Sequence, residues 1–172
     1  MKKFSEKLTE MRASKDAIEW VGDKTMEEAW ETCERGDWML CGYQKLYPEK
    51  IREITLAKGH CANTVRHLMK DERSRTAVDA AIAFGEGKIS SEELAAAAYD
   101  AADAYPYAIA FATSDTAPAR VATEAAAVDA PAYAVAAFAA YATAVDAETE
   151  TARKANLLET ANICRKYLII NK

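Results

Sequence analysis

Glycine and proline are scarce in this chain, and alternating runs of apolar and polar residues are missing. Only six glycines and four prolines occur among 172 residues. Because these two residue types mark most turns and breaks, few interruptions of regular structure are expected. Apolar residues recur every three or four positions, as in helices, instead of every second position, as in strands. We therefore predict an all-α fold: a helical bundle with short N-terminal helices and long Ala-rich antiparallel helices.

Long apolar runs are absent as well. No window approaches the roughly 18 strongly apolar residues that a membrane helix needs, because Asp, Glu and Pro interrupt the Ala-rich region. Lys2 and Lys3 are followed by Ser5-Glu6-Lys7, where a secretion signal would be apolar. We expect a cytoplasmic protein with no membrane partner, in which Cys33, Cys41, Cys61 and Cys164 stay reduced.

The usual catalytic and cofactor motifs are also missing. There is no P-loop, GxGxxG, HExxH or GxSxG motif. The cysteine spacing fits no zinc pattern, and His60 and His67 are seven residues apart, not at the i, i+4 spacing that suits a helical ligand pair. The alternative to simple helix packing of these side chains is a metal site built from Cys33, Cys41, Cys61 and His60. We predict a non-enzyme with no catalytic residue, no metal and no cofactor.

The N-terminal part carries clear helix signals. Ser14 can cap one helix, and Thr25-Met26-Glu27-Glu28 forms a capping box for the next. The stretch CERGDWMLC, from Cys33 to Cys41, contains an Arg-Gly-Asp triplet. We interpret it as a junction of two helices and not as an adhesive loop, with Gly36 at a positive-φ C′ position and Asp37 as the following N-cap.

Alanine dominates the second half of the chain. About half of the residues from Ala95 to Ala147 are alanine, so we expect one domain over 1–172, with a short-helix part (1–72) and an Ala-rich bundle (73–172). Pro106 and Pro131 predict kinks or breaks. Small residues recur at heptad-like spacing, which lets helices approach closely, and aromatic residues such as Tyr99 and Phe138 would supply the missing bulk. The seams are Leu94, Ala98, Ala101, Tyr105, Ala108 and Ala112, then Val121, Ala125, Val128, Ala132, Val135, Ala139 and Ala142.

Charge is distributed unevenly. The net charge of −5 and pI of about 5.2 argue against direct nucleic-acid binding. From Ser90 to Ala152 there are ten acidic residues and one basic residue, Arg120, which gives −9 for this segment and +4 for the rest. Solubility alone does not require a single sign, whereas a one-sign field steers a basic partner toward the protein. The acidic face that we assign to such a partner comprises Glu92, Asp100, Asp103, Glu124 and Asp129.

Three tryptophans within nineteen residues form a second candidate site. Trp20, Trp30 and Trp38 are joined by Arg35 and Asp37, and tryptophan and arginine are the residue types that dominate binding interfaces. This set predicts either a small core cluster or a site for a small, nucleotide-like ligand.

Several segments resemble a known group of proteins. DAIEWVG (Asp16–Gly22), TMEEAWETCERGDWML (Thr25–Leu40) and NICRKYL (Asn162–Leu168) are similar to segments of Ala-rich helical proteins of bacteria and tailed phages. The region Arg73–Ala98 resembles the all-helical immunity-protein family of bacterial toxin systems. The resemblance implies neutralisation of a toxin by binding, and it carries no catalytic residues.

These features lead to three functional hypotheses. The first is a non-enzymatic acidic helical protein that inhibits a basic protein, either a toxin or a nucleic-acid-binding defence protein, as in immunity or phage anti-defence. The second is binding or sequestering of a small ligand at the tryptophan set. The third is a self-assembling structural protein, a homo-oligomer in which the Ala seams pair between chains.

Overall fold

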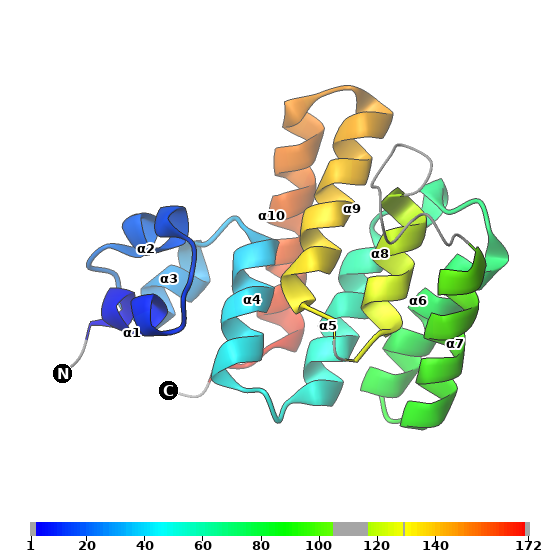
Figure 1. The fold of residues 1–172 in the computed structure, drawn as a ribbon. Helices are drawn as coiled ribbons and strands as arrows, with labels where there is room; N and C mark the ends of the chain where they lie inside the picture. The colour runs from blue at the N-terminus through cyan, green and yellow to red at the C-terminus, as the bar shows by residue number, and fades with distance from the viewer. Residues whose placement is uncertain (1–2, 105–116, 129, 171–172) are drawn as a thin grey trace.

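The computed structural model describes residues 3–104, 117–128 and 130–170, and over these ranges the chain is helical with no strand (Figure 1). This confirms the all-α prediction. None of the helices in these ranges has the length and apolar character that crossing a bilayer requires. The helices are α1 (Phe4–Glu10), α2 (Lys15–Val21), α3 (Met26–Thr32), α4 (Gly36–Leu46), α5 (Ile51–Asn63), the 3₁₀ helix η1 (Arg66–Leu68), α6 (Glu72–Gly85), α7 (Ser91–Ala104), α8 (Ala117–Ala126), α9 (Ala132–Ala147) and α10 (Glu150–Tyr167).

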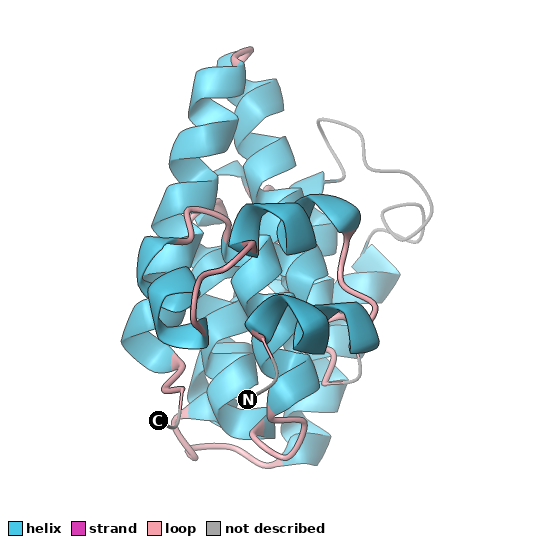
Figure 2. Cartoon of the chain, turned by 90° about the vertical axis from the view of Figure 1, so that its left-hand side faces the viewer, coloured by secondary structure: helices cyan, strands magenta, loops and turns pink. Residues whose placement is uncertain are grey.

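Helices α4 to α10 form the bundle, and α1–α3 lie on one side of it, next to α4 (Figures 1 and 2). Composition grouped α4 and α5 with the short N-terminal helices, but in the structure α4 packs on α9 and α10, and α5 packs on α6, α8 and α9. Helix α7 packs on α6 and α8 and lies at the edge of the bundle farthest from α1–α3 (Figure 1). The two candidate sites are therefore on opposite sides of the molecule.

The Ala-rich seams pair within this one chain. Helices α7 and α8 pack together, as do α8 and α9, because small side chains let their axes approach closely. The buried seam residues are Leu94, Ala101, Val121, Ala125, Ala132, Val135, Ala139 and Ala142. Pro131 separates α8 from α9 as expected, whereas Pro106 lies outside the described residues.

The predicted helix caps are present. The Thr25 hydroxyl accepts a hydrogen bond from the Glu28 amide at 3.1 Å, and the Glu28 carboxylate accepts one from the Thr25 amide at 2.8 Å. The Ser14 hydroxyl caps α2 by accepting from the Ala17 amide at 3.3 Å. These bonds satisfy amides that would otherwise lack partners at the helix starts.

The role predicted for Gly36 was wrong. Helix α3 already ends at Thr32, and Gly36 is the first residue of α4, where Arg35 is the N-cap. Positive φ occurs at Gly22 and Gly87 among the described glycines, and not at Gly36. A Cβ at Gly36 would overlap the side chain and backbone of Thr160 on α10. Glycine is thus needed here because two helices approach closely, and Asp37, predicted as an N-cap, lies instead in the buried first turn of α4.

Candidate functional site

The three short helices α1–α3 are attached to the bundle by long side chains. Lys45 of α4 donates through Nζ to the backbone oxygen of Met11 at 2.5 Å. Arg165 of α10 donates to the backbone oxygens of Trp30, at 3.1 Å, and Cys33. Beside these contacts, a space lined by residues of both layers lies between α1–α3 and α4.

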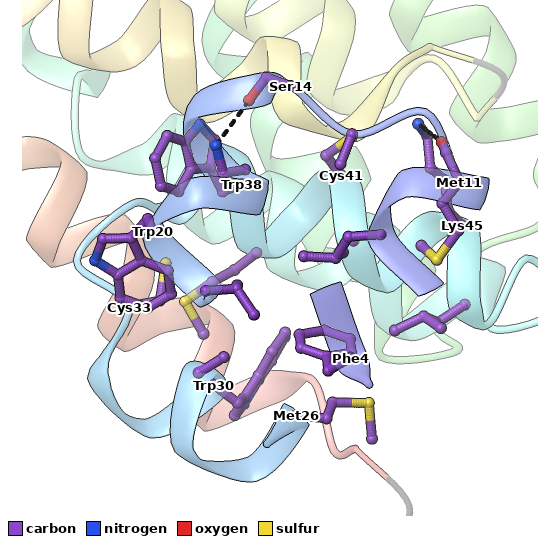
Figure 3. A pocket seen from close by; sticks show the side chains of 18 of the residues that line it. Phe4, Met11, Ser14, Trp20, Met26, Trp30, Cys33, Trp38, Cys41 and Lys45 are labelled. Carbon is purple, nitrogen blue, oxygen red and sulfur yellow. Dashed lines mark hydrogen bonds between the residues drawn. The ribbon is translucent and has the colours of Figure 1, made fainter. Parts of the chain in front are cut away.

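That space is a cavity of about 290 Å³ with mostly apolar walls (Figure 3). All three tryptophans of the chain line it, together with residues from α1, α4 and the C-terminal end of the described chain. The other apolar lining residues include Phe4, Leu8, Met11, Met26, Met39, Leu46 and Ile170. The structure brings Trp20, Trp30 and Trp38 to one cavity, and all three also pack, partly buried, against the hydrophobic core.

The tryptophan rings are held by neighbouring aromatic and cationic groups. Trp20 and Trp38 meet edge to face, with ring centroids 6.1 Å apart and an interplanar angle of 60°. The Trp30 ring lies 5.9 Å from that of Tyr43. Lys24 places its Nζ 4.5 Å from the Trp20 ring centre and donates to the Trp20 backbone oxygen at 2.7 Å. Edge-to-face and cation–π contacts of this kind fix ring orientation.

Arg35 and Asp37 form a two-pronged ion pair beside this cavity. Arg35 donates from Nε and Nη2 to the two Asp37 oxygens at 2.8 and 2.6 Å, and its guanidinium lies 4.4 Å from the Trp38 ring centre. The hydrogen bond to Asp37 raises the pKa of Arg35. Asp37 lines the cavity but Arg35 does not. This corrects the prediction that Arg35 faces a ligand, because its guanidinium is already bound by the Asp37 carboxylate and covers the Trp38 ring.

The acidic set is only partly brought together. Glu92, Asp100 and Asp103 are exposed on α7. Glu124 on α8 has a side chain only 18% exposed and pairs with Arg120 at 3.7 Å, so it is not a free surface carboxylate. Asp129 lies outside the described residues. The surface that remains is one helix and not the whole acidic segment.

Two exposed α7 residues were not included in the predicted acidic face. Glu93, which was left out of the predicted acidic face, is exposed and accepts from the Ser90 amide at 2.8 Å. Tyr99 was expected to supply core bulk, but it is 76% exposed. Its position off the seam of Leu94, Ala98 and Ala101 was a signal that could have placed it on the surface.

The cysteines and His60 are used in packing. Cys33, Cys61 and Cys164 are buried, and burial, followed by a hydrogen bond with the Cys164 thiol, raises the pKa of Cys61. The His60 ring stacks on Tyr167 with centroids 4.2 Å apart, and burial lowers the pKa of His60. Within the described ranges, no group of three or more His, Cys, Asp or Glu side chains could hold a metal ion.

Native-state alkylation should label Cys41 first. Cys41 is the half-buried cysteine and lines the cavity, whereas the other three thiols are buried. Burial raises the pKa of Cys41, so its labelling rate should still be rising at pH values where an exposed thiol has levelled off. Iodoacetamide labelling followed by peptide mass mapping measures this. In Cys41→Ser, labelling should require unfolding; early labelling of Cys61 or Cys164 would contradict the burial described.

Comparison with family models, with curated proteins and with solved structures gives no match to this chain. Its function is therefore inferred from the geometry and chemistry of its own residues.

Proposed function

We propose that this chain is a non-enzymatic binding protein that inhibits a basic protein partner through the exposed side of α7. The observation that carries the proposal is a stripe of four carboxylates around one exposed tyrosine. It comprises Glu92, Glu93, Tyr99, Asp100 and Asp103, all exposed. We call these five residues the α7 surface.

Helical spacing puts these five residues on one side of α7. Glu92 and Tyr99 are seven residues apart, as are Glu93 and Asp100, and Asp103 follows Tyr99 by four. Helix α7 contains no Lys or Arg. The pKa of Arg73, on neighbouring α6, is raised mainly by its hydrogen bond to Asp71 and to a lesser extent by Asp103 and Asp100. That arginine is engaged at 3.0 Å by Asp71, so the α7 carboxylates present negative charge to solvent.

Charge and aromatic character have different roles on such a surface. A field of one sign speeds encounter with a partner of opposite sign and disfavours acidic competitors. A tyrosine that projects among charges offers a large apolar face and a hydroxyl, a combination enriched at the centres of interfaces. Inhibition of a toxin, as in immunity, or of a nucleic-acid-binding defence protein, as in phage anti-defence, is the biological setting that we propose for this surface.

Capture from cell lysate with charge-matched variants tests the proposal. The α7 variant is Glu92→Gln, Asp100→Asn and Asp103→Asn; the turn variant is Asp146→Asn, Glu148→Gln and Glu150→Gln, at the exposed turn between α9 and α10. Both variants lose three negative charges. A basic protein retained by wild type and the turn variant, and lost by the α7 variant, is the expected result. Capture of no basic protein, or equal retention by both variants, would overturn the proposal.

A further inference from the structure

We propose that the cavity between α1–α3 and α4 is a binding site for an uncharged aromatic molecule of two or three rings. This inference is independent of the α7 surface, which lies on the other side of the bundle. It depends on the size of the cavity, on the state of its polar groups and on its ring-lined walls (Figure 3).

Several polar groups at the cavity already have partners, and the further lining cation, Arg12, is an exposed residue. Both Asp37 oxygens accept from Arg35, and Lys45 Nζ donates to the backbone oxygens of Met11 and Arg12. The Ser14 hydroxyl accepts from the Ala17 amide. A charged ligand would have to break these pairs, because burying a charge without a partner is costly. The mostly apolar walls therefore favour an uncharged ligand over the nucleotide-like ligand considered from the sequence.

The cavity has room for more than one ring. A closed apolar cavity of about 150 Å³ binds benzene, and this cavity measures about 290 Å³, roughly twice that volume. Trp20, Trp30 and Trp38 all line it, and aromatic side chains favour stacked and edge-to-face contacts with another aromatic system. Met11, Met26 and Met39 also line it, and methionine adapts its shape to irregular apolar ligands. Size and lining thus point to the same ligand class.

Gly42 provides a way to fill the cavity without disturbing the fold. It lines the cavity from α4, and a Cβ built on it would meet no heavy atom within 4 Å. Gly42→Phe should therefore place a ring in the ligand's space, while removal of a helical glycine favours the helix. Ala155→Phe, at an exposed position of α10, is the matched control for non-specific binding to an added surface ring.

The test is titration with N-phenyl-1-naphthylamine, an uncharged three-ring probe that accepts excitation energy from tryptophan. The expected result is saturable sensitised emission with one site per chain in wild type and Ala155→Phe, and its loss in Gly42→Phe, whose melting temperature shows that it is folded. The probe should also slow alkylation of Cys41, another lining residue. The proposal would be overturned if wild type showed no saturable binding or if Gly42→Phe bound the probe equally well. It would also be overturned if wild type bound no probe and were a dimer that Gly42→Phe converts to a monomer.

Discussion

Replacing Gly36 by alanine is expected to lower the free energy of unfolding by about 1–3 kcal/mol, as overpacking of a tight helix contact does. The added Cβ would overlap Thr160, whose side chain is fully buried on α10. Relief would require α4 and α10 to move apart, which would also disturb buried Cys164, whose Sγ lies 3.8 Å from the Gly36 backbone oxygen. Urea unfolding followed by far-UV circular dichroism measures the change.

Gly42→Ala on the same helix is the control for helix propensity. Since its added Cβ meets open space, this substitution should raise the free energy of unfolding by about 0.5–1 kcal/mol. The two glycine-to-alanine changes, six residues apart in α4, should thus change the free energy of unfolding in opposite directions. The difference separates the cost of overpacking the helix contact from the higher helix propensity of alanine. A gain of stability in Gly36→Ala would show that α4 and α10 do not approach as described.

Replacing Arg35 by methionine is expected to cost about 2–4 kcal/mol, because it leaves a mostly buried carboxylate without its partner. The Asp37 side chain is 11% exposed, and both of its oxygens bind Arg35. The Trp38 ring would also lose the guanidinium that covers it. Urea unfolding followed by circular dichroism measures the loss of stability of the whole fold, and tryptophan fluorescence reports the change around Trp38.

The double variant Arg35→Met with Asp37→Leu separates an orphaned charge from lost packing. When both partners of a buried ion pair become apolar, most of the cost of breaking it should disappear. We therefore expect the double variant to be more stable than Arg35→Met alone. A double variant as unstable as the sum of the two single variants would mean that the pair acts through its shape and not through charge.

Local signals in the sequence were sufficient for the helices and for the caps at Ser14 and Thr25. Ser14 and Thr25 lie where the capping rules put them, because a cap depends only on a side chain and amides three residues away. Gly36 shows the limit of such rules. Its local sequence suggested a helix end, but its role is set by Thr160, which is distant along the chain and adjacent in space.

The candidate sites also combine features that local sequence predicts with features that depend on residues distant along the chain. The seam of Val121 and Ala125 was visible in the sequence, and Glu124, which lies beside both, could have been excluded from the free surface on that basis. The cavity could not be predicted in the same way. It lies between α1–α3 and the bundle, where Lys45 and Arg165 bind backbone oxygens of residues far away in the sequence. No local pattern encodes which backbone oxygens these side chains reach.

The most direct test of the acidic binding surface is the affinity of the captured, purified basic partner for wild type, the α7 variant and the turn variant, measured at low and at physiological ionic strength. Wild type and the turn variant should bind alike and weaken together as salt is raised, since salt screens exposed charges. The α7 variant should bind roughly ten- to hundredfold more weakly at low salt and depend less on salt. An α7 variant that binds as tightly as wild type, or a wild-type affinity that does not change with salt, would contradict binding through the α7 carboxylates.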